Sequence, residues 1–154
     1  MANLSGLELR SKITSGGKLE LSLEEAVVPV PAADEVVVRV EASPINPSDL
    51  GMLLGPADSS TFTAGGTAER PTATAAVPQS RLAAVAGRLD QSMLVGNEGA
   101  GVVVEAGAEA RTWLGRRVAT RTFGMYAQYR IARMADCLLL PAGATSRQDR
   151  KSVV

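Results

Sequence analysis

Residues 93–107 constrain the fold of this chain more than any other stretch, because closely spaced glycines run directly into consecutive valines. Gly96, Gly99 and Gly101 permit positive φ angles and close approach of the backbone, whereas the valines at 102–104 favour a buried, pleated surface. The sequence therefore predicts a tight bend that leads into a core strand. The glycine spacing is not that of a dinucleotide-binding loop and no helical pattern follows it, so no phosphate-binding loop is predicted here.

Two polar residues, Asn97 and Glu98, lie inside this apolar and glycine-rich stretch. An unpaired polar group in such surroundings would cost a few kcal/mol, so both side chains need partners. Taken alone, the pattern favours hydrogen bonds to the surrounding loop backbone. A functional role is the alternative.

Composition narrows the possible functions. The 154 residues are enough for one domain with its own core. Lysine plus arginine and aspartate plus glutamate both number 16, so no global charge favours nucleic acid or an anionic membrane as a partner. The chain has no histidine, the commonest general base and metal ligand. Its one cysteine, Cys137, adjoins an apolar run and is predicted to be an inert core residue.

Alternating and β-branched stretches with glycine and proline turns predict an all-β barrel or sandwich. The strands are expected at 7–13 and 19–23, which form a hairpin, and at 35–42, 102–104, 114–121, 123–132 and 137–140.

Between the strands, two prolines stiffen the loop at 43–50, where Ser48 or Asp49 is expected to cap a short helical turn. Residues 55–79 predict an exposed insertion, and 81–93 a short amphipathic helix that packs over the barrel or acts as a lid. No stretch suits a membrane helix or a secretory leader, which predicts a cytoplasmic protein.

Four segments together resemble the N-terminal, GroES-like catalytic domain of the medium-chain dehydrogenase/reductase family. They lie at 31–42, 45–50, 96–118 and 124–143, so the resemblance covers nearly the whole chain. It implies a mainly β, partly open barrel with short helices over residues 1–145, a longer than usual insertion at 55–93, and a non-native or disordered tail at 146–154. The Rossmann domain that follows in the family is absent from the chain.

The resemblance also implies a branch of the family. Zinc-dependent alcohol dehydrogenases carry a cysteine where Asn46 stands and a histidine where Asn97 stands, so the chain is similar to the zinc-independent quinone oxidoreductases and enoyl reductases. A tyrosine that quinone reductases often place shortly after the asparagine is missing, and Leu50, Met52 and Leu53 occupy the nearby positions.

Site residues follow from the resemblance. Asn46 is expected beside the nicotinamide, as a catalytic and cofactor-binding residue, and Tyr126 is a weaker catalytic candidate whose other role is packing. The remaining expectations are a substrate cleft lined by Asp49, Met52 and Asn97, and structural roles for Glu98, Gly96, Gly101 and Gly107.

The function implied is that of an N-terminal fragment of an NADPH-dependent reductase, without zinc, acting on a small quinone or conjugated carbonyl substrate. The complete protein is expected to be a homodimer, and the fragment inactive alone. A stand-alone GroES-like binding or scaffold module is the alternative. A third reading, zinc alcohol dehydrogenase, would require metal ligands that Asn46 and Asn97 cannot supply.

Overall fold

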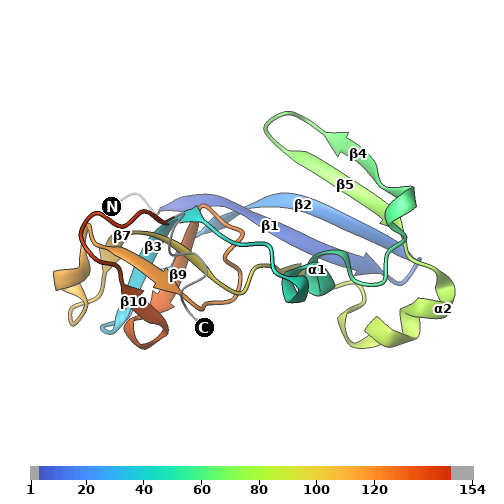
Figure 1. The fold of residues 1–154 in the computed structure, drawn as a ribbon. Helices are drawn as coiled ribbons and strands as arrows, with labels where there is room; N and C mark the ends of the chain where they lie inside the picture. The colour runs from blue at the N-terminus through green and yellow to red at the C-terminus, as the bar shows by residue number, and fades with distance from the viewer. Residues whose placement is uncertain (1–3, 147–154) are drawn as a thin grey trace. The chain divides into compact units, whose positions relative to one another are not determined.

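The computed structural model describes residues 4–146, and their strands form two antiparallel sheets. One sheet has the strand order β4-β5-β2-β1-β6 and the other the order β10-β8-β7-β3-β9 (Figure 1). The mainly β, GroES-like fold class expected from the sequence is confirmed, since neither sheet closes into a barrel within the described residues. The tail expected at 146–154 lies outside the described residues, apart from Ser146.

The strands are β1 (Ser5–Thr14), β2 (Lys18–Val27), β3 (Glu35–Ala42), β4 (Thr63–Gly66), β5 (Pro71–Ala76), β6 (Ser92–Leu94), β7 (Gly99–Ala106), β8 (Arg117–Thr120), β9 (Tyr129–Arg133) and β10 (Cys137–Leu139). The α-helices are α1 (Pro47–Leu54) and α2 (Gln79–Leu82), and 3-10 turns cover Ser59–Thr61, Ala83–Arg88, Arg111–Trp113 and Met134–Asp136.

The chain divides into two compact units. Among the described residues, the first unit comprises 4–8, 25–44 and 96–146, and the second comprises 9–24 and 45–95. The long strands β1 and β2 contribute residues to both units. Each unit is described below by itself.

In the first unit, β3 is the strand around which the sheet is built. It pairs with β7 on one side and β9 on the other, and Val36, Val37 and Val38 are all fully buried. Consecutive valines suit a strand that is covered on both faces, as the sequence predicted. Val36 and Val38 join Val103 and Val118 in the core of this unit.

In the second unit, the hairpin predicted from residues 7–23 is confirmed by the pairing of β1 with β2. Ile13 and Leu19 are fully buried and form a core with Leu82. The helix expected at 81–93 is wrong in extent, because a short α2 passes into a 3-10 turn and then into β6. Its apolar residues Val85 and Leu89 nevertheless pack against the core.

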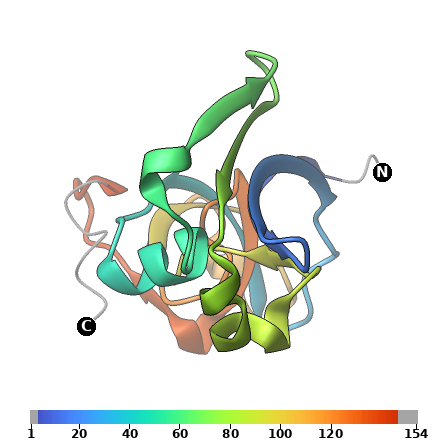
Figure 2. The same ribbon diagram turned by 90° about the vertical axis from the view of Figure 1, so that its right-hand side faces the viewer.

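Two other regions differ from what the sequence predicted. The segment expected as an exposed insertion is exposed at 61–71, but it contains the β4–β5 hairpin, and β5 pairs with β2 (Figures 1 and 2). The strand expected at 123–132 begins only at Tyr129, because Gly124 adopts φ 88° and turns the chain. Within residues 4–146, no helix is long and apolar enough to cross a membrane.

Candidate functional site

Asn46 lies at the start of α1, in the second unit, and its backbone is held by Asp49. Asp49 Oδ2 accepts a hydrogen bond from the Asn46 backbone N–H at 2.8 Å, in a capping-box arrangement. The cap therefore lies at Asn46 rather than at Ser48 or Asp49, because Pro47 has no N–H to lose and suits the first helical position. Asp49 is fully buried, whereas Asn46 is half-buried.

The other end of α1 is held by residues distant in the sequence. Arg88 Nη1 donates to the backbone oxygen of Met52 at 3.0 Å and contacts its sulfur atom at 3.2 Å. Ser11 Oγ donates to the backbone oxygen of Leu53 at 2.8 Å, and Arg88 Nη2 lies 3.3 Å from that hydroxyl. These bonds satisfy carbonyl groups that a helix terminus leaves without internal partners. A cation at this end also complements the helix dipole.

Arg88 has no carboxylate in these contacts, and its Nε is buried without a hydrogen-bond partner. Burial lowers the pKa of its guanidinium from the ordinary value. In these contacts the charge faces carbonyl and hydroxyl oxygens and the Met52 sulfur atom. We call Ser11, Arg88 and the α1 carbonyls of Met52 and Leu53 the α1 clamp.

In the first unit, the bend at Gly96 is held by the backbone. Gly96 adopts φ 92°, and its carbonyl oxygen accepts hydrogen bonds from the N–H groups of Gly124 and Met125 at 2.7 and 3.2 Å. A Cβ atom on Gly96 would lie 2.8 Å from both the backbone nitrogen and a ring carbon of Tyr126. The predicted tight bend is thus present, and only glycine fits it.

Tyr126 lies against this bend. Its hydroxyl donates to the carbonyl oxygen of Pro44 at 2.9 Å, so it ties the 124–126 turn to the end of the segment that follows β3. This bond uses the hydroxyl proton and favours the packing role over proton donation. Asn97 is exposed next to the bend, and Glu98 is half-buried.

Gly101 and Gly107 occupy positions where main chains meet closely. A Cβ atom on Gly101 would collide with the carbonyl oxygen of Arg39 on β3, and one on Gly107 with that of Ala32. A side chain at either position would therefore force the neighbouring main chains apart.

Cys137 is half-buried on β10 and packs against the core of the first unit. Burial raises the pKa of its thiol, which favours the protonated, less nucleophilic form. In the part of the chain that the structure describes, no group of three or more cysteine, aspartate and glutamate residues is arranged to hold a metal ion.

The site residues expected from the sequence fall into two groups. Asn46, Asp49 and Met52 lie together on α1 in the second unit, whereas Asn97, Glu98 and Tyr126 lie around the Gly96 bend in the first. No sequence pattern indicated Arg88 and Ser11, because their contacts with α1 join positions 36 and 42 residues apart.

The fold agrees with that of known proteins. Residues 32–142 match the alcohol dehydrogenase GroES-like domain, and the chain belongs to that family. No curated protein matches the chain.

Solved structures share the fold. They include a candidate NADPH:quinone reductase from Bacillus thuringiensis, with 22% identity and a TM-score of 0.64 over 98% of this chain and 38% of that one. Escherichia coli quinone oxidoreductase in complex with NADPH has 19% identity and a TM-score of 0.58 over 97% and 37%. A mutant enoyl thioester reductase from Candida tropicalis has 20% identity and a TM-score of 0.58 over 96% and 40%. The chain thus spans about two fifths of each of these proteins.

Proposed function

We propose that this chain is the substrate-side domain of an NADPH-dependent, zinc-independent oxidoreductase that reduces a quinone or a conjugated carbonyl compound. In this proposal residues 1–145 form the domain and 55–93 its insertion. Membership of the GroES-like family supports it, together with an amide at Asn46, where the zinc-dependent members carry a cysteine. Since the chain spans about two fifths of the similar structures, the activity proposed is that of a complete protein.

Asn46 is the residue on which the proposal depends. Its backbone is fixed by Asp49 while its side chain remains half-buried at the start of α1. An amide offers both donors and an acceptor but does not titrate, so it can orient a carbonyl or a nicotinamide amide without moving a proton. This donor set fits a bound nicotinamide cofactor, which supplies the hydride when present.

The α1 clamp supports this role at a distance. By fixing the last turn of α1, Arg88 and Ser11 hold the helix that carries Asn46, Asp49 and Met52. Orientation is what such a site must supply, because alignment of the reacting groups accounts for a large part of catalysis in hydride transfer.

The proposal is tested by joining the chain to a Rossmann domain from a quinone oxidoreductase and assaying NADPH oxidation with a panel of quinones and enones. We expect oxidation by the fused protein. The chain alone, shown to be folded by a thermal melt, should not bind NADPH in calorimetry. A well-folded fusion that is inactive across the panel, or saturable NADPH binding by the chain alone, would contradict the proposal.

Substitution of Asn46 separates chemistry from helix capping. Serine at this position keeps a good N-cap but removes the amide, so Asn46→Ser should leave the melting temperature of the fused protein nearly unchanged and lower its kcat/KM at least tenfold. Asn46→Ala should lower both. Full activity in the Asn46→Ser protein would exclude an orienting role for the amide.

A further inference from the structure

Arg130, on β9, is a partly buried arginine that the proposed function does not use. Its Nη1 lies 3.4 Å from Oε2 of Glu8 on β1, and the two side chains are 21% and 7% exposed. A carboxylate buried to this extent needs a cationic partner, because an isolated charge away from water is costly. The ion pair therefore restricts where the guanidinium can lie.

Backbone pairing brings the two charges together. Glu8 forms an isolated antiparallel bridge with Ala127. Beside it, the Gln128 N–H donates to the Leu7 oxygen at 2.8 Å, and Gln128 Oε1 accepts from the Leu7 N–H at 2.9 Å. The start of β1 is thus held along the residues that lead into β9, and all of these residues belong to the first unit.

The guanidinium of Arg130 packs on Gly124. A Cβ atom placed on this glycine would lie 2.8 Å from Cζ, 2.9 Å from Nη2 and 3.1 Å from Nε of the arginine. Because the central carbon is the nearest of the three atoms, the contact is made by the flat face of the group and not by its edge. Gly124 also adopts φ 88°, a conformation that strains other residues.

The turn under Arg130 is the one that holds the Gly96 bend. The N–H groups of Gly124 and Met125 donate to the Gly96 oxygen, at 2.7 and 3.2 Å. Asn97, one of the residues expected to line the substrate cleft, directly follows that bend. Arg130 therefore contacts the same turn that fixes the residue before Asn97.

We propose that Arg130 is a positioning residue for the Gly96 bend. Held by Glu8, its guanidinium packs on Gly124 and keeps the turn in place. The turn then fixes the bend that presents Asn97 to the substrate. Stability alone is a poor explanation for the ion pair, since an apolar pair of similar size is often as stabilising. The effect on substrate binding rests on the proposed function, whereas the effect on the turn can be measured in the chain itself.

Arg130→Lys tests the packing on the turn. Lysine keeps a positive charge opposite Glu8 but has no planar face to lay on Gly124. In a folded Arg130→Lys chain, amide exchange at Gly124 and Met125 should be about tenfold faster than in the wild type, because the turn opens more often. Unchanged exchange at both amides would overturn the proposal.

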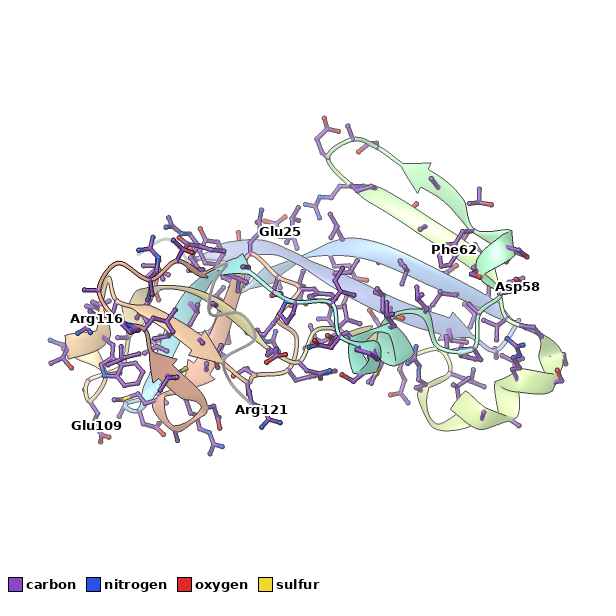
Figure 3. The ribbon with its side chains drawn as sticks, in the orientation of Figure 1. Glu25, Asp58, Phe62, Glu109, Arg116 and Arg121 are labelled. Atoms are coloured by element: carbon purple, nitrogen blue, oxygen red, sulfur yellow. The ribbon has the colours of Figure 1, made fainter. Side chains whose placement is uncertain are left out.

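Arg121→Lys is the matched control, since Arg121 is exposed and Figure 3 shows its side chain extending away from the ribbon. It should leave the exchange of the turn amides unchanged. The Val103 N–H on β7, which donates to the Arg116 oxygen at 3.0 Å, is the internal reference and should exchange at the same rate in every variant.

Two glycine variants keep the proposal testable if Arg130→Lys fails to fold. Gly124 and Gly143 adopt nearly the same φ, 88° and 89°, but nothing lies within 4 Å of a Cβ placed on Gly143. Gly124→Ala should therefore lower the urea midpoint about twice as far as Gly143→Ala, and Arg130→Ala should remove most of that difference. Equal losses in the two alanine variants would contradict the packing of Arg130 on the turn.

The substrate role is tested in the fusion to a Rossmann domain. Arg130→Lys should raise the KM for the quinone or enone about fivefold and leave kcat and the KM for NADPH nearly unchanged, as for a lost binding contact. Arg121→Lys should change none of the three. An unchanged substrate KM in an active Arg130→Lys fusion would overturn this role. An inactive wild-type fusion would instead contradict the proposed function, and amide exchange would still decide whether Arg130 holds the turn.

Discussion

The helix α1 and the Gly96 bend are both rigid, but they are held in different ways. The helix is fixed at one end by Asp49 and at the other by Arg88 and Ser11, all through side chains. The bend is fixed through backbone hydrogen bonds to the Gly96 carbonyl oxygen and through the absence of a side chain on that residue. Substitutions that remove polar side chains should therefore destabilise α1. Substitutions that add a Cβ atom should destabilise the glycine-rich segment.

The largest effect should come from adding one carbon to β7. In Gly101→Ala the new Cβ would collide with the Arg39 carbonyl oxygen on β3, so the central strand pairing must shift. We expect a loss of about 3 kcal/mol in the free energy of unfolding, measured by urea denaturation. Gly115→Ala is the control, because φ there is 74° but no atom lies within 4 Å. A loss no greater than in that control would refute the role of close approach.

Removing the guanidinium of the α1 clamp should have the next largest effect. Arg88→Met leaves the Met52 carbonyl and the Ser11 hydroxyl without this donor, at an expected cost of about 2 kcal/mol in urea denaturation. Amide exchange should accelerate in α1 and remain unchanged in β7. Arg81→Met, which loses one exposed bond to Pro56, should change stability by less than about 0.5 kcal/mol. Equal losses in the two proteins would argue against the clamp.

Breaking the capping box should cost less. Asp49→Ala removes the acceptor of the Asn46 N–H, and we expect a loss of about 1 to 2 kcal/mol in a chemical melt. Ser48→Ala serves as the control, since Ser48 is exposed and lies outside the box. If Ser48→Ala were the more damaging change, the cap would lie where the sequence alone suggested.

A glycine in the helix should behave in the opposite way to Gly101. Nothing lies within 4 Å of a Cβ placed on Gly51 in α1. Gly51→Ala should therefore stabilise the chain by about 0.5 to 1 kcal/mol through helix propensity, seen as a higher urea midpoint. Destabilisation would mean that the helix, too, depends on close packing at glycine.

The smallest effect concerns a surface carboxylate in the first unit. Ser146 Oγ donates to Glu41 Oε2 at 2.7 Å, and this bond, with support from Arg117, lowers the pKa of Glu41. A carboxylate whose pKa is lowered by folding stabilises the fold at pH values above its ordinary pKa, which is about 4.3 for glutamate. This stabilisation is lost as the pH falls through the pKa of the folded state. In Ser146→Ala the Glu41 pKa should rise toward that value in an NMR titration. An unchanged titration would assign the shift to the arginines.

Regular patterns in the sequence predicted the regular parts of the fold. The valines of β3 and the alternation of β1 and β2 identify their strands, since each reflects burial of a whole face. The β4–β5 hairpin escaped detection because alanine, threonine and glycine give no contrast between its faces.

The sequence predicted only those features of the candidate site that depend on residues close together in the chain. Asp49 was recognised near the start of a helical turn, although the cap proved to be Asn46. Arg88 could not be found, because its partner Ser11 is 77 residues away and only the folded chain brings the two together.

Cys137 is the only thiol in the chain, and it lies on β10, which pairs with β8. Burial raises the pKa of that thiol and leaves the side chain half-buried, so a reagent that modifies thiolates should react more slowly with the folded chain than after the edge of the sheet opens. The ratio of the Cys137 labelling rates in the folded and the unfolded chain should therefore report how strongly the pairing of β10 with β8 protects this edge of the sheet.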